Sequence, residues 1–247
     1  RAYSLAYIPY FTCEVMLEPL EKLGIPYQFY TIDDQLNPVL DFDVGATECL
    51  LYTNYFGLKQ DTVQSLSEKY ANLIVDNSQG FFSEPLKTVD TFFSCRKFFG
   101  VSDGAYLHIK ESFKGKFERD ISMGRFNHLI KSIDINKESA YPDFVANDNS
   151  LSRSPIRRMS HLTQRLLSGI DYKECKYRRN ANFMYLHDFL SKYNDLQIDT
   201  SLINSPMIYP FLHSSSKIRE KLLENKSYAA TYWPNVFQWT TKKMWEN

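Results

Sequence analysis

The first hundred residues alternate between short apolar runs and segments of helical periodicity. This alternation is typical of crossover units, in which a helix joins each strand to a parallel neighbour. We expect strands at 6–11, 25–33, 49–57 and 72–78, and helices at 13–24 and 61–71. These segments predict an α/β protein with a mixed, mostly parallel sheet flanked by helices.

Particular residues indicate where the two helices begin and end. Gly24 closes the first helical run and is a common helix-ending residue. Asp61 precedes an apolar stripe at Val63, Leu66 and Tyr70, and we expect it to be the N-cap of the second helix. That helix would then be a crossover between two parallel strands.

Two further strand-like runs, 89–95 and 104–110, are separated by only a short segment. A parallel crossover needs roughly a dozen residues or more, whereas antiparallel strands can be joined by a short loop. The two runs are therefore predicted to be adjacent and antiparallel.

The second half of the chain is more polar. The run 141–155 is rich in Asn, Ser, Asp and Pro and predicts a loop, and helical periodicity follows over 159–190. The tail reads as strand, helix and strand over 202–236. We therefore expect a large domain over 1–194 and a small C-terminal α+β domain over 195–247.

The charge balance limits the classes of partner. Lys plus Arg and Asp plus Glu number 29 each, so no overall field favours nucleic acid or an anionic membrane. The four cysteines form no CxxC pair, and no histidine lies at metal-ligand spacing, so no metal site is predicted. No apolar run approaches the roughly 20 residues that cross a bilayer. We expect a cytoplasmic protein that binds neither nucleic acid nor membrane.

Polar residues at the carboxyl ends of parallel strands are the candidates for a ligand site. Asp76 and Lys97 follow neighbouring predicted strands and lie 21 positions apart (97 minus 76). A pyridoxal-phosphate (PLP) enzyme needs a lysine that binds the aldehyde and a carboxylate that keeps the pyridine nitrogen protonated. Asp76 and Lys97 could fill both roles. Taken alone, the spacing favours an ordinary strand-end cap and a surface lysine.

The sequence around these two residues carries a longer pattern. The run NLIVDNSQGFF, followed by DTFFSCRKFFGVSDGAYL, resembles the sugar-aminotransferase group of fold-type I PLP enzymes, the DegT/StrS family. IPYFTCEVMLEPLEKLGIPYQFYTID looks like that family's strand, helix and strand near the cofactor ring, and YTNYFG resembles its P-x-H-x-x-G region. The resemblance covers residues 8–107 and implies an aspartate-aminotransferase-like fold and a homodimer.

The resemblance implies a role for each matching residue. Lys97 would form the Schiff base with PLP, and Asp76 would pair with the pyridine nitrogen. Gln79 would lie near the phenolic oxygen, and Ser94 would contact the phosphate. Further cofactor contacts are expected from Phe11, Thr12 and Asn54. The candidates for substrate contact are Tyr10, Tyr55, Arg153 and Trp233.

Several features depart from the family pattern. Cys13 stands where the family often places an aromatic, and the segment from Ser94 to Lys97 is shorter than usual. The family's phosphate-binding turn, rich in Gly, Ser and Thr, has no counterpart at the start of the chain. We therefore expect a divergent member that lacks parts of both termini. A solvated basic loop for Arg153 and a packed aromatic for Trp233 are the structural alternatives for two of the substrate candidates.

Together these features predict a PLP-dependent aminotransferase. It would move an amino group from an amino-acid donor to a keto-sugar nucleotide in polysaccharide or related glycan biosynthesis. In the family that the sequence resembles, dehydration usually goes with a histidine in place of this lysine, so the resemblance and Lys97 together imply transamination. The alternative is a non-catalytic binding or assembly protein of the same fold. A nucleotide-dependent oxidoreductase is disfavoured because no GxGxxG follows a predicted strand.

Overall fold

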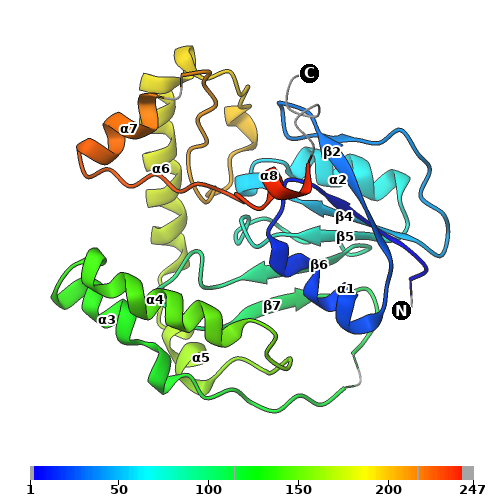
Figure 1. Cartoon of the computed structure of the whole chain (residues 1–247), viewed down its shortest axis with the longest axis horizontal. Helices are drawn as coiled ribbons and strands as arrows, with labels where there is room; N and C mark the ends of the chain where they lie inside the picture. Colours follow the sequence, from blue (N-terminus) through cyan, green and yellow to red (C-terminus); the bar gives the residue numbers. More distant parts are fainter. Residues whose placement is uncertain (1–2, 114, 216, 241–247) are drawn as a thin grey trace.

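Seven strands form one sheet in the order β3-β2-β1-β4-β5-β6-β7 (Figure 1). The computed structural model describes residues 3–113, 115–215 and 217–240. The strands are Ala6–Pro9 (β1), Tyr27–Ile32 (β2), Pro38–Val39 (β3), Cys49–Thr53 (β4), Leu73–Asp76 (β5), Asp90–Ser94 (β6) and Ala105–His108 (β7). Neighbours from β2 through β6 pair in parallel, whereas β3 and β7 run antiparallel at the two edges. The predicted α/β class is confirmed, and so is the antiparallel pairing of the last two strands.

Helices flank this sheet (Figure 1). The α-helices are Glu18–Leu23 (α1), Gln60–Lys69 (α2), Asn127–Asp134 (α3), Lys137–Leu151 (α4), His161–Ser168 (α5), Tyr172–Leu190 (α6), Lys217–Glu224 (α7) and Val236–Trp239 (α8). The 3-10 helices are Glu14–Met16, Tyr55–Gly57, Met123–Arg125, Ser191–Tyr193 and Thr200–Leu202. In Figure 1, α3, α4 and α5 gather beside the β6–β7 side of the sheet, and the chain later returns to place α8 near β2. The ring of Trp239 stacks on Phe29 of β2 with centroids 5.0 Å apart.

The ends of α1 and α2 agree with the sequence in one case and differ in the other. Gly24 closes α1 in the left-handed conformation at φ 63°, as expected of a glycine C-cap. The predicted N-cap Asp61 is wrong, because α2 begins one residue earlier and Lys59 occupies the cap position. The Lys59 amide donates instead to Asn54 Oδ1 at 2.8 Å. Asp61 lies in the first turn of α2, where an acidic side chain interacts favourably with the positive end of the helix dipole.

The main core lies between the sheet and α2. All five residues of β4 are buried, as expected of a central strand covered on both faces. Leu50, Tyr52 and Val75 from the sheet pack in one cluster with Val63 and Leu66 of α2. Burial of each such side chain contributes about 1.5–3 kcal/mol, which fixes the strands that carry the candidate site.

The loop predicted over 141–155 is wrong, because most of that run belongs to α4. The helix begins before the polar run, at Lys137, and its N-cap is Asn136, whose side chain accepts from the amide of Ser139 at 2.8 Å. Ala140 is buried, and α3 packs alongside α4. The Asn, Asp and Ser residues of this run therefore belong to a helix that is largely exposed to solvent. Only the end of the run, after Leu151, is not helical.

Helical structure over 159–190 is confirmed in two pieces. Gly169 ends α5, and Asp171 opens α6 by accepting from the amides of Lys173 and Glu174 at 3.0 Å each. A break at this point lets α5 and α6 take different directions (Figure 1).

The strands predicted in the tail are wrong, since the described residues after β7 contain helices, irregular segments and one isolated bridge. Side chains of α6 form hydrogen bonds with backbone groups of residues 205–207, where a predicted strand would have bonded to a neighbouring strand. Ser205 donates its amide to Asn180, and Arg179 donates to the carbonyls of Pro206 and Met207. The predicted α7 helix is confirmed. The domain boundary at 194/195 stays a prediction.

Candidate active site

The sheet reverses its winding between β1 and β4. The strand β1 pairs with β2 on one side and with β4 on the other, both in parallel. Connections therefore leave the carboxyl ends of β1 and β4 in opposite directions, and a crevice opens at that edge. The same edge carries the ends of β5 and β6, so the candidate residues after all four strands face one region.

Asp76 is the last residue of β5, and only 5% of it is exposed. Its Oδ1 accepts a hydrogen bond from the amide of Ser78 at 2.7 Å. The amide of Asn54 donates to the Asp76 carbonyl at 3.0 Å, and the amide of Asn77 donates to the Phe92 carbonyl at 2.8 Å. Backbone bonds to both neighbouring strands thus fix this carboxylate at the edge of the sheet.

Lys97 follows β6, and its side chain reaches back to the β5 loop. Its Nζ donates to Ser78 Oγ at 2.9 Å. Ser78 therefore contacts Lys97 through its hydroxyl and Asp76 through its amide. The two residues proposed to carry the chemistry are brought to one serine, as the strand-end argument expects. Sequence analysis did not single out Ser78, whose position two residues after an acidic strand end was the available signal.

Three buried polar atoms near this edge have no hydrogen-bond partner in the described protein. They are Gln79 Nε2, Thr12 Oγ1 and Thr53 Oγ1. Gln79 is fully buried, and its Oε1 accepts from the amide of Phe56 at 2.8 Å, so Nε2 is the side-chain donor left over. A buried donor without a partner costs about 1–3 kcal/mol, so such groups mark places where a polar ligand can bind. Thr12, Thr53 and Gln79 lie at or just after the carboxyl ends of β1, β4 and β5, the sheet edge that also carries Asp76, with Lys97 after β6. A carboxylate, an amine and polar side chains at one edge are groups of the kind that PLP needs.

The segment after β1 also reaches the site. Burial raises the pKa of the Cys13 thiol, the charge of Lys97 lowers it, and the charge of Asp76 raises it. Cys13 therefore lies near both proposed chemical groups. Phe11 turns toward the core, with its ring centroid 4.5 Å from that of Trp233 and 5.7 Å from that of Tyr55.

Two predicted contact residues serve the scaffold in this structure. Asn54 Nδ2 donates to Asn77 Oδ1 at 2.9 Å and to Ser83 Oγ at 3.1 Å, and its Oδ1 is taken by Lys59. Tyr55 is fully buried and donates to the Phe11 carbonyl at 2.9 Å. Their polar atoms are already bound to protein groups.

The remaining predicted residues are spread more widely. Ser94 ends β6 and pairs with Ala105 of β7. The Tyr10 ring stacks on Phe29 at 4.6 Å. Trp233 packs in the aromatic core, and the exposed Arg153 lies after α4, where its amide donates to Glu18 of α1. The structural alternatives given for Arg153 and Trp233 thus agree with their surroundings.

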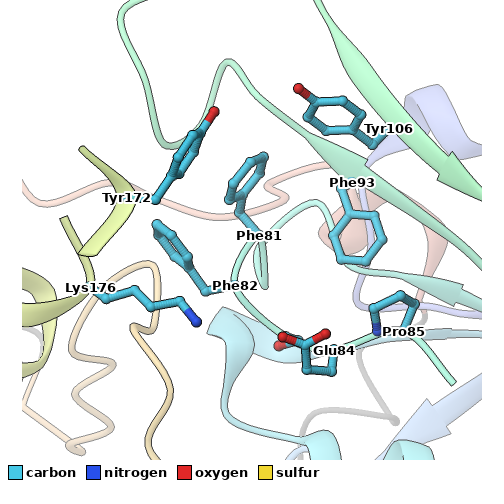
Figure 2. A pocket seen from close by; sticks show the side chains of 9 residues that line it. Phe81, Phe82, Glu84, Pro85, Phe93, Tyr106, Tyr172 and Lys176 are labelled. Atoms are coloured by element: carbon cyan, nitrogen blue, oxygen red, sulfur yellow. The ribbon is translucent and has the colours of Figure 1, made fainter. Parts of the chain in front are cut away.

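A pocket of about 320 Å³ lies beside the segment that follows β5 (Figure 2). Its lining residues are Phe81, Phe82, Ser83, Glu84, Pro85, Phe93, Tyr106, Tyr172 and Lys176. Phe81 and Phe82 also contact the rings of Phe98 and Phe99, which directly follow Lys97. Neither Lys97 nor Asp76 lines this cavity.

Two kinds of feature are absent from residues 3–113, 115–215 and 217–240. No group of His, Cys, Asp and Glu side chains in those ranges is arranged to hold a metal ion. No helix there is both long and apolar enough to span a bilayer.

Comparison with known proteins gives matches in structure. No family model and no curated protein matches the sequence. The chain is similar to the crystal structure of AtS13 from Actinomadura melliaura, with a TM-score of 0.56 and 12% identity over 97% of this chain and 70% of that one. It is also similar to the sugar aminotransferase CalS13 from Micromonospora echinospora, with a TM-score of 0.51 and 11% identity over 92% and 66%.

A further match is the apo-form of a putative sugar aminotransferase, Spr1654, from Streptococcus pneumoniae. Its TM-score is 0.51, with 12% identity over 96% of this chain and 69% of that one. The chain therefore spans about two thirds of the length of these structures. At this identity the likeness establishes that the chain has the fold of sugar aminotransferases.

Proposed function

We propose that this chain is the PLP-binding part of a PLP-dependent aminotransferase. The observation that carries the proposal is the arrangement of Lys97 and the buried Asp76 around Ser78, at the carboxyl edge of a sheet with the sugar-aminotransferase fold. The unpartnered amide of Gln79 beside this pair supports it.

Bound PLP would supply an electrophilic aldehyde and a ring that accepts electrons from a substrate carbon. Lys97 would hold it covalently through Nζ and, when released, would carry a proton at that nitrogen. The Asp76 carboxylate would face the protonated pyridine nitrogen, and Gln79 Nε2 would donate to the phenolic oxygen. Thr12 would lie beside the ring, and Ser94 would bind the phosphate.

The proposed reaction is transfer of an amino group from an amino-acid donor to a keto-sugar nucleotide. The support is the similarity to structures described as sugar aminotransferases, together with the resemblance of the Asp76 and Lys97 segments to that family. The donor and the sugar nucleotide, a cytoplasmic location, a homodimer and a place in polysaccharide biosynthesis are part of the same proposal.

An absorption spectrum tests the function directly. The full-length protein is incubated with PLP before and after Lys97→Ala, with Lys173→Ala, an exposed lysine on α6, as the matched control. We expect a visible band in the wild type and in the control, which is lost in Lys97→Ala and shifts when glutamate is added. Borohydride reduction followed by peptide mapping should place the cofactor on Lys97. Absence of the band from the wild type would overturn the proposed enzyme function and favour a non-catalytic protein of this fold.

A further inference from the structure

The loop that carries Lys97 is attached to the rest of the protein at several points. We call residues 95–104 the lysine loop. It leaves the end of β6 and returns to the start of β7, and the amide of Cys95 donates to the carbonyl of Gly104 at 3.1 Å. This hydrogen bond joins the two ends of the loop, so a shift of Gly104 would also move Cys95, two residues before Lys97.

Asp103 provides the buried attachment of this loop. Only 5% of the residue is exposed. Its carboxylate accepts from the amide of Ser160 at 2.9 Å, from the Ser160 hydroxyl at 3.2 Å, and from the hydroxyl of Thr163. Three protein donors therefore hold this buried carboxylate in place.

The partners of Asp103 form the start of α5. Ser160 is the N-cap of this helix, and its Oγ accepts from the amide of Thr163 at 3.0 Å. Ser160 Oγ also lies 2.6 Å from Ser122 Oγ. The carboxylate thus joins the lysine loop to a helix end whose own hydrogen bonds are already formed.

Close packing reinforces the same attachment. Gly104 has φ +106°, and a Cβ at this position would lie 2.9 Å from Thr163 Cγ2. The backbone of the loop therefore approaches α5 as closely as a glycine allows.

The other attachments are weaker. Arg96 pairs with Asp148 of α4 at 2.9 Å, but the two side chains are 24% and 60% exposed, and exposed pairs contribute about 0–1 kcal/mol. Asn147 of α4 donates to the Ser102 carbonyl at 3.1 Å, and Arg179 of α6 donates to the Phe98 carbonyl at 3.4 Å. Among these contacts, only the Asp103 carboxylate is buried and accepts from three donors.

We propose that Asp103 is a positioning residue for Lys97. By holding the lysine loop against α5, it keeps Lys97 Nζ within reach of Ser78 and of any aldehyde bound beside Asp76. This inference rests on the proposed function for the role of Lys97, and on the contacts of Asp103 for its own part.

The test compares Asp103→Asn with Asp171→Asn. Both substitutions keep one oxygen acceptor and remove a carboxylate that accepts hydrogen bonds from residues at a helix start. Asp171 accepts from the amides of Lys173 and Glu174 in the first turn of α6, so these bonds do not reach the lysine loop. Hydrogen exchange of residues 95–104, acylation of Lys97 by acetic anhydride relative to the exposed Lys87, and the apparent Kd for PLP are measured on the full-length proteins. Thr163→Val, which removes one hydroxyl donor to Asp103, serves if Asp103→Asn does not fold.

In Asp103→Asn we expect faster exchange in the lysine loop and faster acylation of Lys97. We also expect PLP binding to weaken about tenfold, the change that about 1.4 kcal/mol produces. In Asp171→Asn all three should stay at the wild-type values. A folded Asp103→Asn with unchanged loop exchange and unchanged Lys97 acylation overturns the proposal, even if its melting temperature falls. If the wild type binds no PLP, the proposed function fails, and exchange and acylation still decide the role of Asp103.

Discussion

Lys97 Nζ donates to Ser78 Oγ at 2.9 Å across 19 positions of sequence. Ser78→Ala removes this acceptor and leaves the Ser78 amide free to bind Asp76. Because Lys97 is exposed and has no second acceptor recorded in the described structure, its amine should sample more orientations. We expect the free energy of unfolding to fall by about 0.5–1.5 kcal/mol, because one hydrogen bond is lost. Formation of the visible PLP band, followed by stopped flow, should slow about tenfold. Ser67→Ala, which removes an exposed hydroxyl on α2, should leave the rate unchanged.

Asp76→Asn tests the carboxylate at the end of β5. Asparagine keeps an oxygen that can accept from the Ser78 amide, so the fold and PLP binding should survive. The charge opposite the ring nitrogen is lost, and the rate of the half-reaction with glutamate should fall about 100-fold or more. Asp90→Asn is the control, since Asp90 accepts from the amide of Lys110 at the other end of β6. Equal losses in the two variants would contradict a special role for Asp76.

Gln79→Glu separates the two ends of the Gln79 side chain. One oxygen can still accept from the Phe56 amide, but the free donor becomes an acceptor. If that donor faces the phenolic oxygen of PLP, two negative oxygens would then meet. We expect PLP binding at pH 8 to weaken about tenfold or more and to recover as the buried carboxyl is protonated at lower pH. Spectral titration of PLP across pH 5–8 checks this expectation, which a pH-independent loss would contradict.

The strands could be predicted because burial on both faces leaves a plain record in the sequence. In β4 and β5 the apolar runs Cys49–Thr53 and Leu73–Asp76 end at polar residues, and the sheet places those ends together. The expectation that Asp76 and Lys97 lie at the same edge of the sheet followed from this rule and from the family resemblance. Their meeting at Ser78 could not, because it depends on how the loop after β6 folds back.

The errors have a common cause. The run 141–155 is made of turn-forming residues, and α4 has no strong apolar stripe, so its helical state depends on Asn136 as a cap and on contact with α3. The start of α2 is set at Lys59, whose amide is held by Asn54 at the end of β4, so Asp61 falls inside the helix. In the tail, α6 side chains take the bonds that a strand partner would otherwise satisfy. Each error arose where a tertiary contact overrode local propensity.

Two buried thiols should make the protein sensitive to alkali. Burial raises the pKa of Cys95 to about 12 and that of Cys49 to about 11, from an ordinary value of 9.0. The folded state therefore holds these protons more tightly than the unfolded state. Their contribution to stability is present below pH 9 and is lost as pH rises through about 11 and 12. Urea denaturation at increasing pH should show this fall.

The same burial should protect both thiols from alkylation at neutral pH. Iodoacetamide at pH 8 should leave Cys49 and Cys95 unmodified in the folded protein. All four cysteines should react once the protein is unfolded in urea. Rapid labelling of Cys95 in the folded protein would mean that the lysine loop opens without global unfolding.

Gly57 lies where the loop after β4 passes the loop after β5. Its φ is +77°, and a Cβ there would lie 3.0 Å from the Gln79 carbonyl oxygen and 3.1 Å from Gly80 Cα. Both neighbours are backbone and cannot move aside without shifting Gln79. Gly57→Ala should therefore cost about 1–2 kcal/mol for the left-handed conformation and about 1–3 kcal/mol more for the contact.

Two other glycines separate these costs. Gly24 has φ +63° with no atom within 4 Å of an added Cβ, so Gly24→Ala should show the conformational cost alone. Gly100 has open space and no left-handed φ, so Gly100→Ala should be neutral or stabilising, because alanine reduces the freedom of the unfolded chain. Chemical denaturation of the three variants measures the free energies of unfolding. If Gly57→Ala lost no more stability than Gly24→Ala, close packing of Gly57 against the Gln79 backbone would not be what holds Gln79 in place.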